Sequence, residues 1–167
     1  IDEERNRLKS TEKCHIFHGR DLFAYCAAKL AAGIITYEEV GEAYPVEEIV
    51  EHELIPYKVE GNRITGMLDN ADYHFGLICS NIPAEVFEQE EIAYGDTVKV
   101  RILQRGKEAP VFEDNVPFCR SFGYVAVGEP LLMVSETLQI QIAINCENMS
   151  EKYGVLAGSD WTMEIEK

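Results

Sequence analysis

The clearest structural signal in this 167-residue chain is the segment Leu138-Gln139-Ile140-Gln141-Ile142-Ala143-Ile144. Large aliphatic residues recur at every second position, with Gln139 and Gln141 between them. Because successive side chains of a β-strand point to opposite faces, this period predicts a strand with one buried face. We expect the aliphatic side chains at positions 138, 140, 142 and 144 to point inward and both glutamines to point outward.

The same period recurs on either side of this stretch. Thr97–Leu103 alternates cleanly, and a Gly61-Asn62 turn joins Tyr57–Glu60 to Arg63–Leu68 as a hairpin. Further strands are expected at Phe75–Ser80, Ala109–Phe112, Leu131–Val134 and Trp161–Ile165, and one helical turn closed by Gly154 is expected at Asn148–Tyr153. Short strands separated by glycine-containing turns predict a mainly β fold, an antiparallel sandwich or β-barrel-like domain.

A helix is expected upstream, at residues 21–32, where five alanines keep its surface thin. Asp21 is expected to cap the first N–H groups, and Gly33 to provide a left-handed stop. His18 precedes this helix on a glycine turn. From the residues alone, His18 is either a solvated side chain at a helix start or a functional group.

These segments predict three parts: a charged lead-in and helix at 1–33, a connector at 34–56, and a C-terminal β domain at 57–167. The apolar fraction of 46% suffices for a core. No apolar run is long enough to span a bilayer, and no signal peptide opens the chain. We therefore expect no membrane partner.

Charge and cysteine usage narrow the function classes. A net charge of −15 without a basic stripe argues against a nucleic-acid partner. The five cysteines are scattered without a Cys-x-x-Cys pair, which predicts reduced thiols in a cytoplasmic protein. The histidines lack the spacing of zinc ligands, so no metal site is expected.

Three blocks of sequence carry a family resemblance. They are Phe17–Ala24 with Gly33; Asp72–Gly76 with Ser80–Ile82; and Ser121–Val125, Gly128-Glu129, Ile142–Asn145, Asn148, Tyr153-Gly154 and Gly158–Asp160. In this order the blocks resemble the S-adenosyl-L-methionine (SAM) hydroxide adenosyltransferase family, which includes the fluorinases and chlorinases. The resemblance covers almost the whole chain from Phe17 onward.

The resemblance implies that the helix belongs to the end of an N-terminal α/β domain and that the β segments form the complete C-terminal domain. Members of the family are typically homotrimers that bind the ligand between the N-terminal domain of one subunit and the C-terminal domain of a neighbour. This chain would therefore act in a homotrimer or with a missing N-terminal domain. SAM is the substrate, and no cofactor is implied.

The implied reaction is displacement of methionine from SAM by water at the ribose 5′ carbon, giving adenosine and methionine. The sulfonium is already a good leaving group, so the protein must exclude bulk water and align the nucleophile. The resemblance assigns His18 the catalytic task of positioning the water, together with an aspartate and an arginine of the N-terminal domain. Gly19 stands where halogenating members carry serine, which favours the hydrolytic branch.

The resemblance also assigns the substrate contacts. Asp72 would lie near the methionine amino group, Phe75 beside the adenosine, and Asn145-Cys146 at the adenine edge, where an amide offers both a donor and an acceptor. Each residue also has a purely structural interpretation. Asp72 could cap a turn, Phe75 could belong to the core, and Asn145 could bond its own loop.

Three positions depart from the family pattern. Leu77 replaces a usual asparagine and Cys79 replaces an aromatic or small polar residue, while Glu136 occupies the turn that holds the methionine carboxylate in the halogenases. Glu136 would repel a carboxylate. Two functions therefore stay open: a SAM hydrolase, of whose site this chain supplies a part, and a non-catalytic β domain that binds adenosine, SAM or a protein partner.

Overall fold

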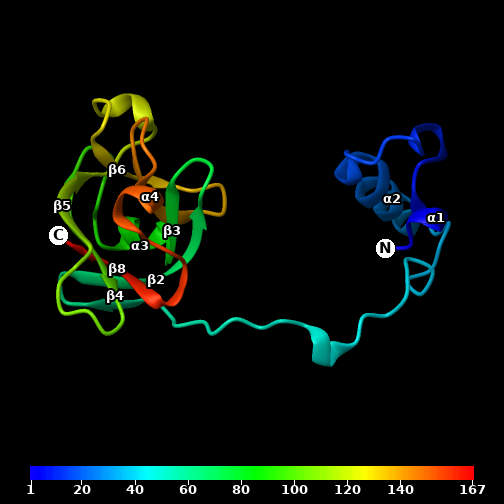
Figure 1. Ribbon diagram of the computed structural model, residues 1–167, viewed down its shortest axis with the longest axis horizontal. Coiled ribbons are helices and arrows are strands. Elements are labelled where there is room, and N and C mark those ends of the chain that lie inside the picture. The colour runs from blue at the N-terminus through cyan, green and yellow to red at the C-terminus, as the bar shows by residue number, and fades with distance from the viewer. The chain divides into compact units, whose positions relative to one another are not determined.

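The computed structural model describes every residue from Ile1 to Lys167. The chain divides into two compact units, Ile1–Glu51 and His52–Lys167. In Figure 1 the first unit contains the blue helices, and the second contains the strands, coloured green to red. No helix in the chain has the length and the apolar character needed to cross a bilayer.

The first unit is helical. Its elements are α1 (Glu3–Asn6), the 3-10 turns η1 (Lys9–Thr11) and η3 (Val46–Glu48), the π-helical segment η2 (Gly19–Ala24), and α2 (Tyr25–Ala31). Segments η2 and α2 follow each other directly and bury Leu22 and Cys26. Gly33 has a φ of 67°, which confirms the expected left-handed stop after this helix.

The prediction that Asp21 caps the helix is wrong. The helix begins at Gly19, two residues earlier than expected, so Asp21 lies inside the first turn. Its carboxylate is fully buried and accepts a hydrogen bond of 2.8 Å from Nη2 of Arg20. This bond and the charge of Arg20 hold the pKa of Asp21 below its ordinary value. A buried carboxylate needs such a partner, and here the ion pair replaces the cap.

The stability of this unit is expected to depend on Asp21 in acid. Because the folded-state pKa of Asp21 is lowered, its contribution is complete above the unfolded-state pKa and is lost as the pH falls below about 4. Amide hydrogen exchange of residues 22–31 should show protection that decreases over this range. In Asp21→Asn this decrease should be smaller, since the carboxyls of Glu3 and Glu38, whose pKa values are also lowered, remain. The exposed control Glu4→Gln should retain it in full, and equal profiles for all three proteins would contradict the prediction.

Two residues of the charged N-terminal segment are buried although their polarity predicts exposure. The amide of Asn6 donates to the carbonyl oxygens of Glu39 and Val40 at 2.9 and 3.0 Å, and its oxygen accepts from Nζ of Lys29 at 2.8 Å. Arg7 is held by Glu3 at 2.9 Å. Polar contacts therefore join α1 to α2 and to the segment that follows it.

The second unit is built from antiparallel strands and two short helices. The strands are β1 (Lys58–Glu60), β2 (Arg63–Asp72), β3 (Leu77–Pro83), β4 (Thr97–Gln104), β5 (Phe112–Pro117), β6 (Pro130–Val134), β7 (Gln139–Ile144) and β8 (Gly158–Glu166). The helices are α3 (Ala84–Gln89) and α4 (Met149–Tyr153), and a 3-10 turn η4 lies at Phe122–Tyr124.

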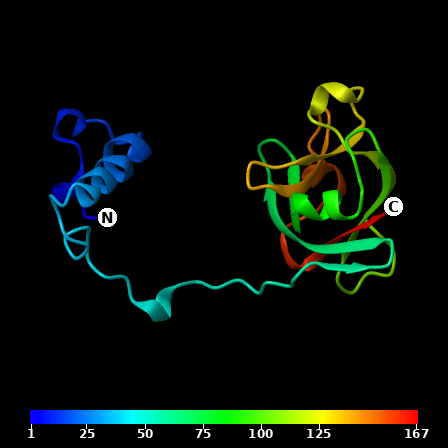
Figure 2. The same ribbon diagram turned by 180° about the vertical axis from the view of Figure 1, so that it is seen from behind.

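Seven strands pair in the order β5-β4-β8-β2-β3-β7-β6, and β1 pairs with β2 as the expected hairpin. A bridge between Phe118 and Leu132 brings the end of β5 to β6, so the sheet forms a nearly closed barrel. This confirms the mainly β fold. Figure 2 shows the strands curving around the core, with α3 inside the curve. The core includes Leu68, Phe87, Ile140, Ile142 and Met163, all at most 1% exposed.

The strand expected at residues 138–144 is confirmed as β7, with two corrections. Ile140, Ile142 and Ile144 are buried as expected, but Leu138 is 71% exposed and has a φ of 60°, because it ends a tight turn instead of starting the strand. Gln141 is only 8% exposed although its side chain points away from the core. Helix α3 had no counterpart in the sequence analysis.

Candidate functional site

The turn from Asp72 to Gly76 connects β2 to β3 and carries two of the expected ligand contacts. Oδ1 of Asp72 accepts hydrogen bonds from the backbone N–H groups of His74 and Phe75, at 2.8 and 3.1 Å. Asp72 therefore forms the structural turn contact that its residue type allows, and its Oδ2 makes no protein hydrogen bond. The ring of Phe75 is 74% exposed. Phe75 is thus no core residue, and its ring is free to contact a ligand.

Asn145 and Cys146 form the tight turn that follows β7, between the bridged residues Ile144 and Glu147. Cys146 has a left-handed φ of 62°. The backbone N–H of Asn145 donates to Glu129 at 3.0 Å, and its carbonyl oxygen accepts from Gly128 at 2.8 Å. Both backbone groups of Asn145 are therefore already used within the protein.

The side chain of Asn145 is also engaged, because its Nδ2 donates to the carbonyl oxygen of Val125 at 2.9 Å. Oδ1 is left with a weak contact of 3.5 Å from the Cys146 thiol. The backbone N–H and C=O of Cys146 have no partner in the chain. A ligand edge that needs one donor and one acceptor would thus find them chiefly on the backbone of Cys146.

Asn148 lies two residues after Cys146 and contacts the Asp72–Gly76 turn. Its Nδ2 donates to the carbonyl oxygen of Tyr73 at 2.8 Å, and its Oδ1 accepts from the N–H of Glu151 at 2.9 Å, which caps α4. Gly76 lies directly against Asn148 and has a φ of 69°. Asn148 therefore ties the Asp72–Gly76 turn to the segment that directly follows the Asn145-Cys146 turn. The contact of Asn148 with Tyr73 was not expected from the sequence, although an asparagine before a helical turn is a capping signal.

Replacing Asn148 by alanine is expected to lower the free energy of unfolding by about 1–2 kcal/mol, because a helix cap and a hydrogen bond are lost together. Urea unfolding followed by the fluorescence of Trp161, the single tryptophan, measures this in the barrel. The exposed control Asn115→Ala should change stability by less than about 0.5 kcal/mol. Equal losses for the two variants would show that the bridge is not important for stability.

A small cavity of about 150 Å³ adjoins the Asp72 side of these turns. It is lined by the carboxylates of Asp69, Asp72 and Glu136, by no basic residue, and by neutral groups that include Leu77 and Cys79. Gln141 also lines it and makes no side-chain hydrogen bond within the protein, which makes it a polar group missed by the sequence analysis. Leu77, Cys79 and Glu136, the three positions that depart from the family pattern, thus line the same cavity.

Cys79 contributes a neutral group to this cavity. Burial raises the pKa of its thiol, and the nearby carboxylates of Asp69 and Glu136 act in the same direction. The thiol is therefore protonated at neutral pH, and it contacts Oε1 of Gln139 at 3.5 Å. Since a thiolate is the reactive form of cysteine, this residue is not an activated nucleophile.

His18 lies in the first unit, at the start of η2. Its side chain is 41% exposed, and its Nε2 lies 3.5 Å from a carboxylate oxygen of Glu3. Its ring is 6.4 Å from that of Phe23, measured between centroids. This partly exposed imidazole can form hydrogen bonds to a ligand or to water through its ring nitrogens. No group of three or more potential metal ligands occurs in the chain.

Residues 66–162 match the family model of the SAM hydroxide adenosyltransferase C-terminal domain. The chain is 28% identical over 144 residues to the fluorinase of Actinoplanes sp. (strain N902-109), and the match covers 85% of this chain and 46% of that enzyme. It is also 28% identical to the fluorinase of Nocardia brasiliensis, with the same coverage. The chain thus spans about half the length of these relatives.

A solved structure also matches the chain. An uncharacterized conserved protein from Thermotoga maritima superposes with a TM-score of 0.62 at 30% identity, and the match covers 91% of this chain and 53% of that one. The matched residues 66–162 include the Asp72 turn, the Asn145-Cys146 turn and the strands that carry them. The chain belongs to the SAM hydroxide adenosyltransferase family, and its barrel is the C-terminal domain of that family.

Proposed function

We propose that this chain supplies the adenosine-binding side of a SAM hydrolase site, in which water displaces methionine from the ribose 5′ carbon. The observation that carries the proposal is the hydrogen bond from Asn148 to the carbonyl oxygen of Tyr73, because it ties the Asp72 turn to the residue two positions after Cys146. In this arrangement Phe75 offers an exposed ring to the adenosine, and the unused backbone groups of Cys146 offer a donor and an acceptor to the adenine edge.

His18 is proposed to orient the attacking water. Its partly exposed ring can hold a water molecule by one nitrogen, and no protonation of the leaving group is needed because the sulfonium departs as a neutral thioether. The remaining contacts would come from an N-terminal domain, either in a longer protein or in a neighbouring subunit of a homotrimer. The five unpaired cysteines favour a reducing compartment such as the cytoplasm.

The cavity beside Asp72 favours a second candidate, a non-catalytic domain that binds adenosine-like ligands. Asp72 suits an ammonium group, but Asp69 and Glu136 would repel the carboxylate of the methionine tail. A carboxylate facing another carboxylate destabilises binding unless one of them is protonated or a cation intervenes. Both candidates share the adenosine contacts and differ in how the methionine tail is held.

Calorimetry with adenosine and with SAM on the complete assembly tests the proposal. Adenosine should bind, and SAM should gain little from its methionine tail. Phe75→Ala should weaken adenosine binding by about tenfold without changing stability, because the ring is exposed. The control Tyr37→Ala, at an exposed tyrosine of the first unit, should bind normally. Much tighter binding of SAM than of adenosine, with Phe75→Ala and Asn145→Ala both without effect, would contradict the assignment.

A further inference from the structure

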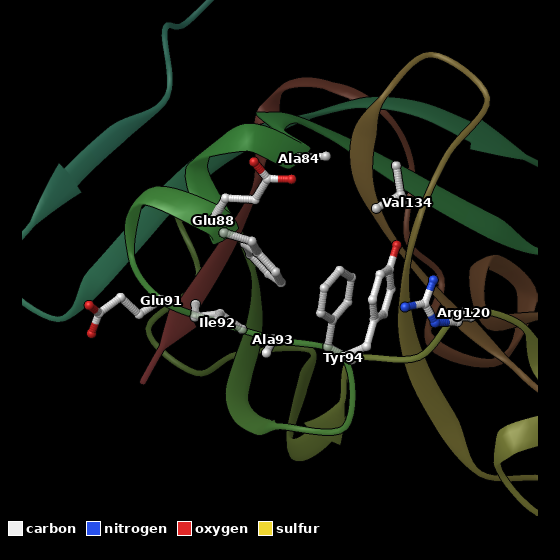
Figure 3. A pocket seen from close by; sticks show the side chains of 10 residues that line it. Ala84, Glu88, Glu91, Ile92, Ala93, Tyr94, Arg120 and Val134 are labelled. Carbon is white, nitrogen blue, oxygen red and sulfur yellow. The ribbon is translucent and has the colours of Figure 1, made fainter.

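A second, larger cavity of about 700 Å³ shares no lining residue with the cavity beside Asp72. It opens between α3, the loop that follows α3, and the segment after β5 (Figure 3). Val134 lines it, and Val134 pairs with Ile140, at the end of the β6–β7 ladder opposite to Ile144 and the Asn145-Cys146 turn. Its volume is in the usual range of small-molecule sites.

The walls of this cavity are aromatic. Phe87 and Phe118 are buried and pack edge to face, with ring centroids 4.8 Å apart. Tyr94 stacks on Phe118 at 4.3 Å with an interplanar angle of 15°, yet it stays 43% exposed. A flat apolar body placed in the cavity would thus meet an aromatic surface that is already built and only partly covered.

Arg120 supplies the positive charge of the cavity. Its guanidinium lies over the Tyr94 ring, 4.4 Å from the centroid, and Figure 3 shows the two groups side by side. Arg120 makes no ion pair with any carboxylate of the chain. Because its N–H groups lie in the plane of the guanidinium, stacking leaves them free to bind an acid group in bidentate fashion.

Glu88 and Glu91 limit how much negative charge a ligand can carry. Both line the cavity, but Glu91 points outward, whereas the carboxylate of Glu88 lies on the α3 side, across from Arg120 (Figure 3). A second acid group on the ligand would approach Glu88 and be repelled. We propose that this cavity binds a small aromatic monoanion, with its ring against Tyr94 and Phe118 and its carboxylate or sulfonate on Arg120.

Three naphthalene compounds with the same ring system test this by calorimetry at neutral pH and low salt: 2-naphthoate, 2-naphthalenemethanol and 2-(aminomethyl)naphthalene. Because the net charge is −15, unspecific binding favours the cationic amine over the anionic naphthoate. Tighter binding of naphthoate therefore requires a positive group within the binding site. Naphthoate should bind about tenfold tighter than the neutral alcohol, and the amine should bind most weakly.

Variants of the protein then test which residues cause the preference for naphthoate. Arg120→Gln should abolish the preference for naphthoate, whereas Arg105→Gln should keep it, because Arg105 is exposed, lies near Asp160 and does not line the cavity. Glu88→Gln should increase naphthoate affinity, a gain that misfolding cannot produce. Val134→Trp should block all three compounds.

The proposal is overturned if the alcohol or the amine binds as tightly as naphthoate, or if Arg120→Gln retains the preference. Absence of binding by every probe at millimolar concentration would also overturn it. If a folded Val134→Trp variant binds the probes with unchanged affinity, the probes bind outside the cavity, and the proposal is overturned as well.

Discussion

The chain Ile1–Lys167 by itself is expected to release adenosine from SAM no faster than an uncatalysed solution does. In the proposed mechanism His18 orients the water together with an aspartate and an arginine that lie in the N-terminal domain of the family. Catalytic groups that act as a unit fail together when one is removed. Without the facing domain the ribose 5′ carbon would also be open to bulk water, and the nucleophile would not be aligned.

Incubation of the purified chain with SAM and chromatographic detection of adenosine measures this. We expect a rate lower by on the order of a thousandfold or more than that of a protein that also carries the N-terminal domain. In that longer protein His18→Ala should lower the rate, and His52→Ala, at an exposed histidine, should leave it unchanged. Adenosine release well above background by the chain alone would show that it holds a complete site.

Gly76→Ala is expected to lower the free energy of unfolding of the barrel by about 2–4 kcal/mol. Two penalties add. Gly76 has a φ of 69°, a conformation that costs an L-residue about 1 kcal/mol or more. An added Cβ would also lie 2.4 Å from Cα of Asn148, and a backbone atom cannot rotate away as a side chain can. The Asp72 turn would have to move away from Asn148.

Gly61→Ala is the matched control, because Gly61 also has a positive φ, of 63°, but an added Cβ would meet nothing within 4 Å. It should cost only about 1 kcal/mol. Urea unfolding followed by Trp161 fluorescence compares the two variants. The same loss of stability in both would show that the contact with Asn148 does not constrain the turn. If the proposed function holds, Gly76→Ala should also weaken adenosine binding, whereas Gly61→Ala should not.

The strands were predictable where local period and turn chemistry agree. The hairpin of β1 and β2 follows from a Gly61-Asn62 turn between two alternating segments, and β4 follows from the clean alternation that begins at Thr97. Helix α4 is bounded by Asn148 and by Gly154, which has a φ of 64°. These signals are local, so they are present in the sequence before any packing occurs.

Helix α3 and the position of Leu138 were not predictable in this way. Helix α3 has six residues, too few to show a helical period, and it forms because Val86 and Phe87 pack into the barrel core. Leu138 continues the alternating pattern, but the N–H of Leu138 bonds to Ser135 at 3.0 Å and its carbonyl oxygen accepts from Ala84 at 2.9 Å. These bonds place Leu138 in a turn, and long-range contacts thereby override the period.

The β class, the hairpin register, the glycine turns and the family resemblance could all be predicted from the amino-acid sequence, because each depends on neighbouring residues or on short motifs. The hydrogen bond from Asn148 to Tyr73, which lies 75 residues earlier in the sequence, forms only when the strands between them have packed. Likewise, only the fold brings Asp69, Asp72 and Glu136 around one cavity, and Tyr94 beside Arg120 around another. Such contacts depend on barrel closure, which is a property of all the strands together and of no single segment.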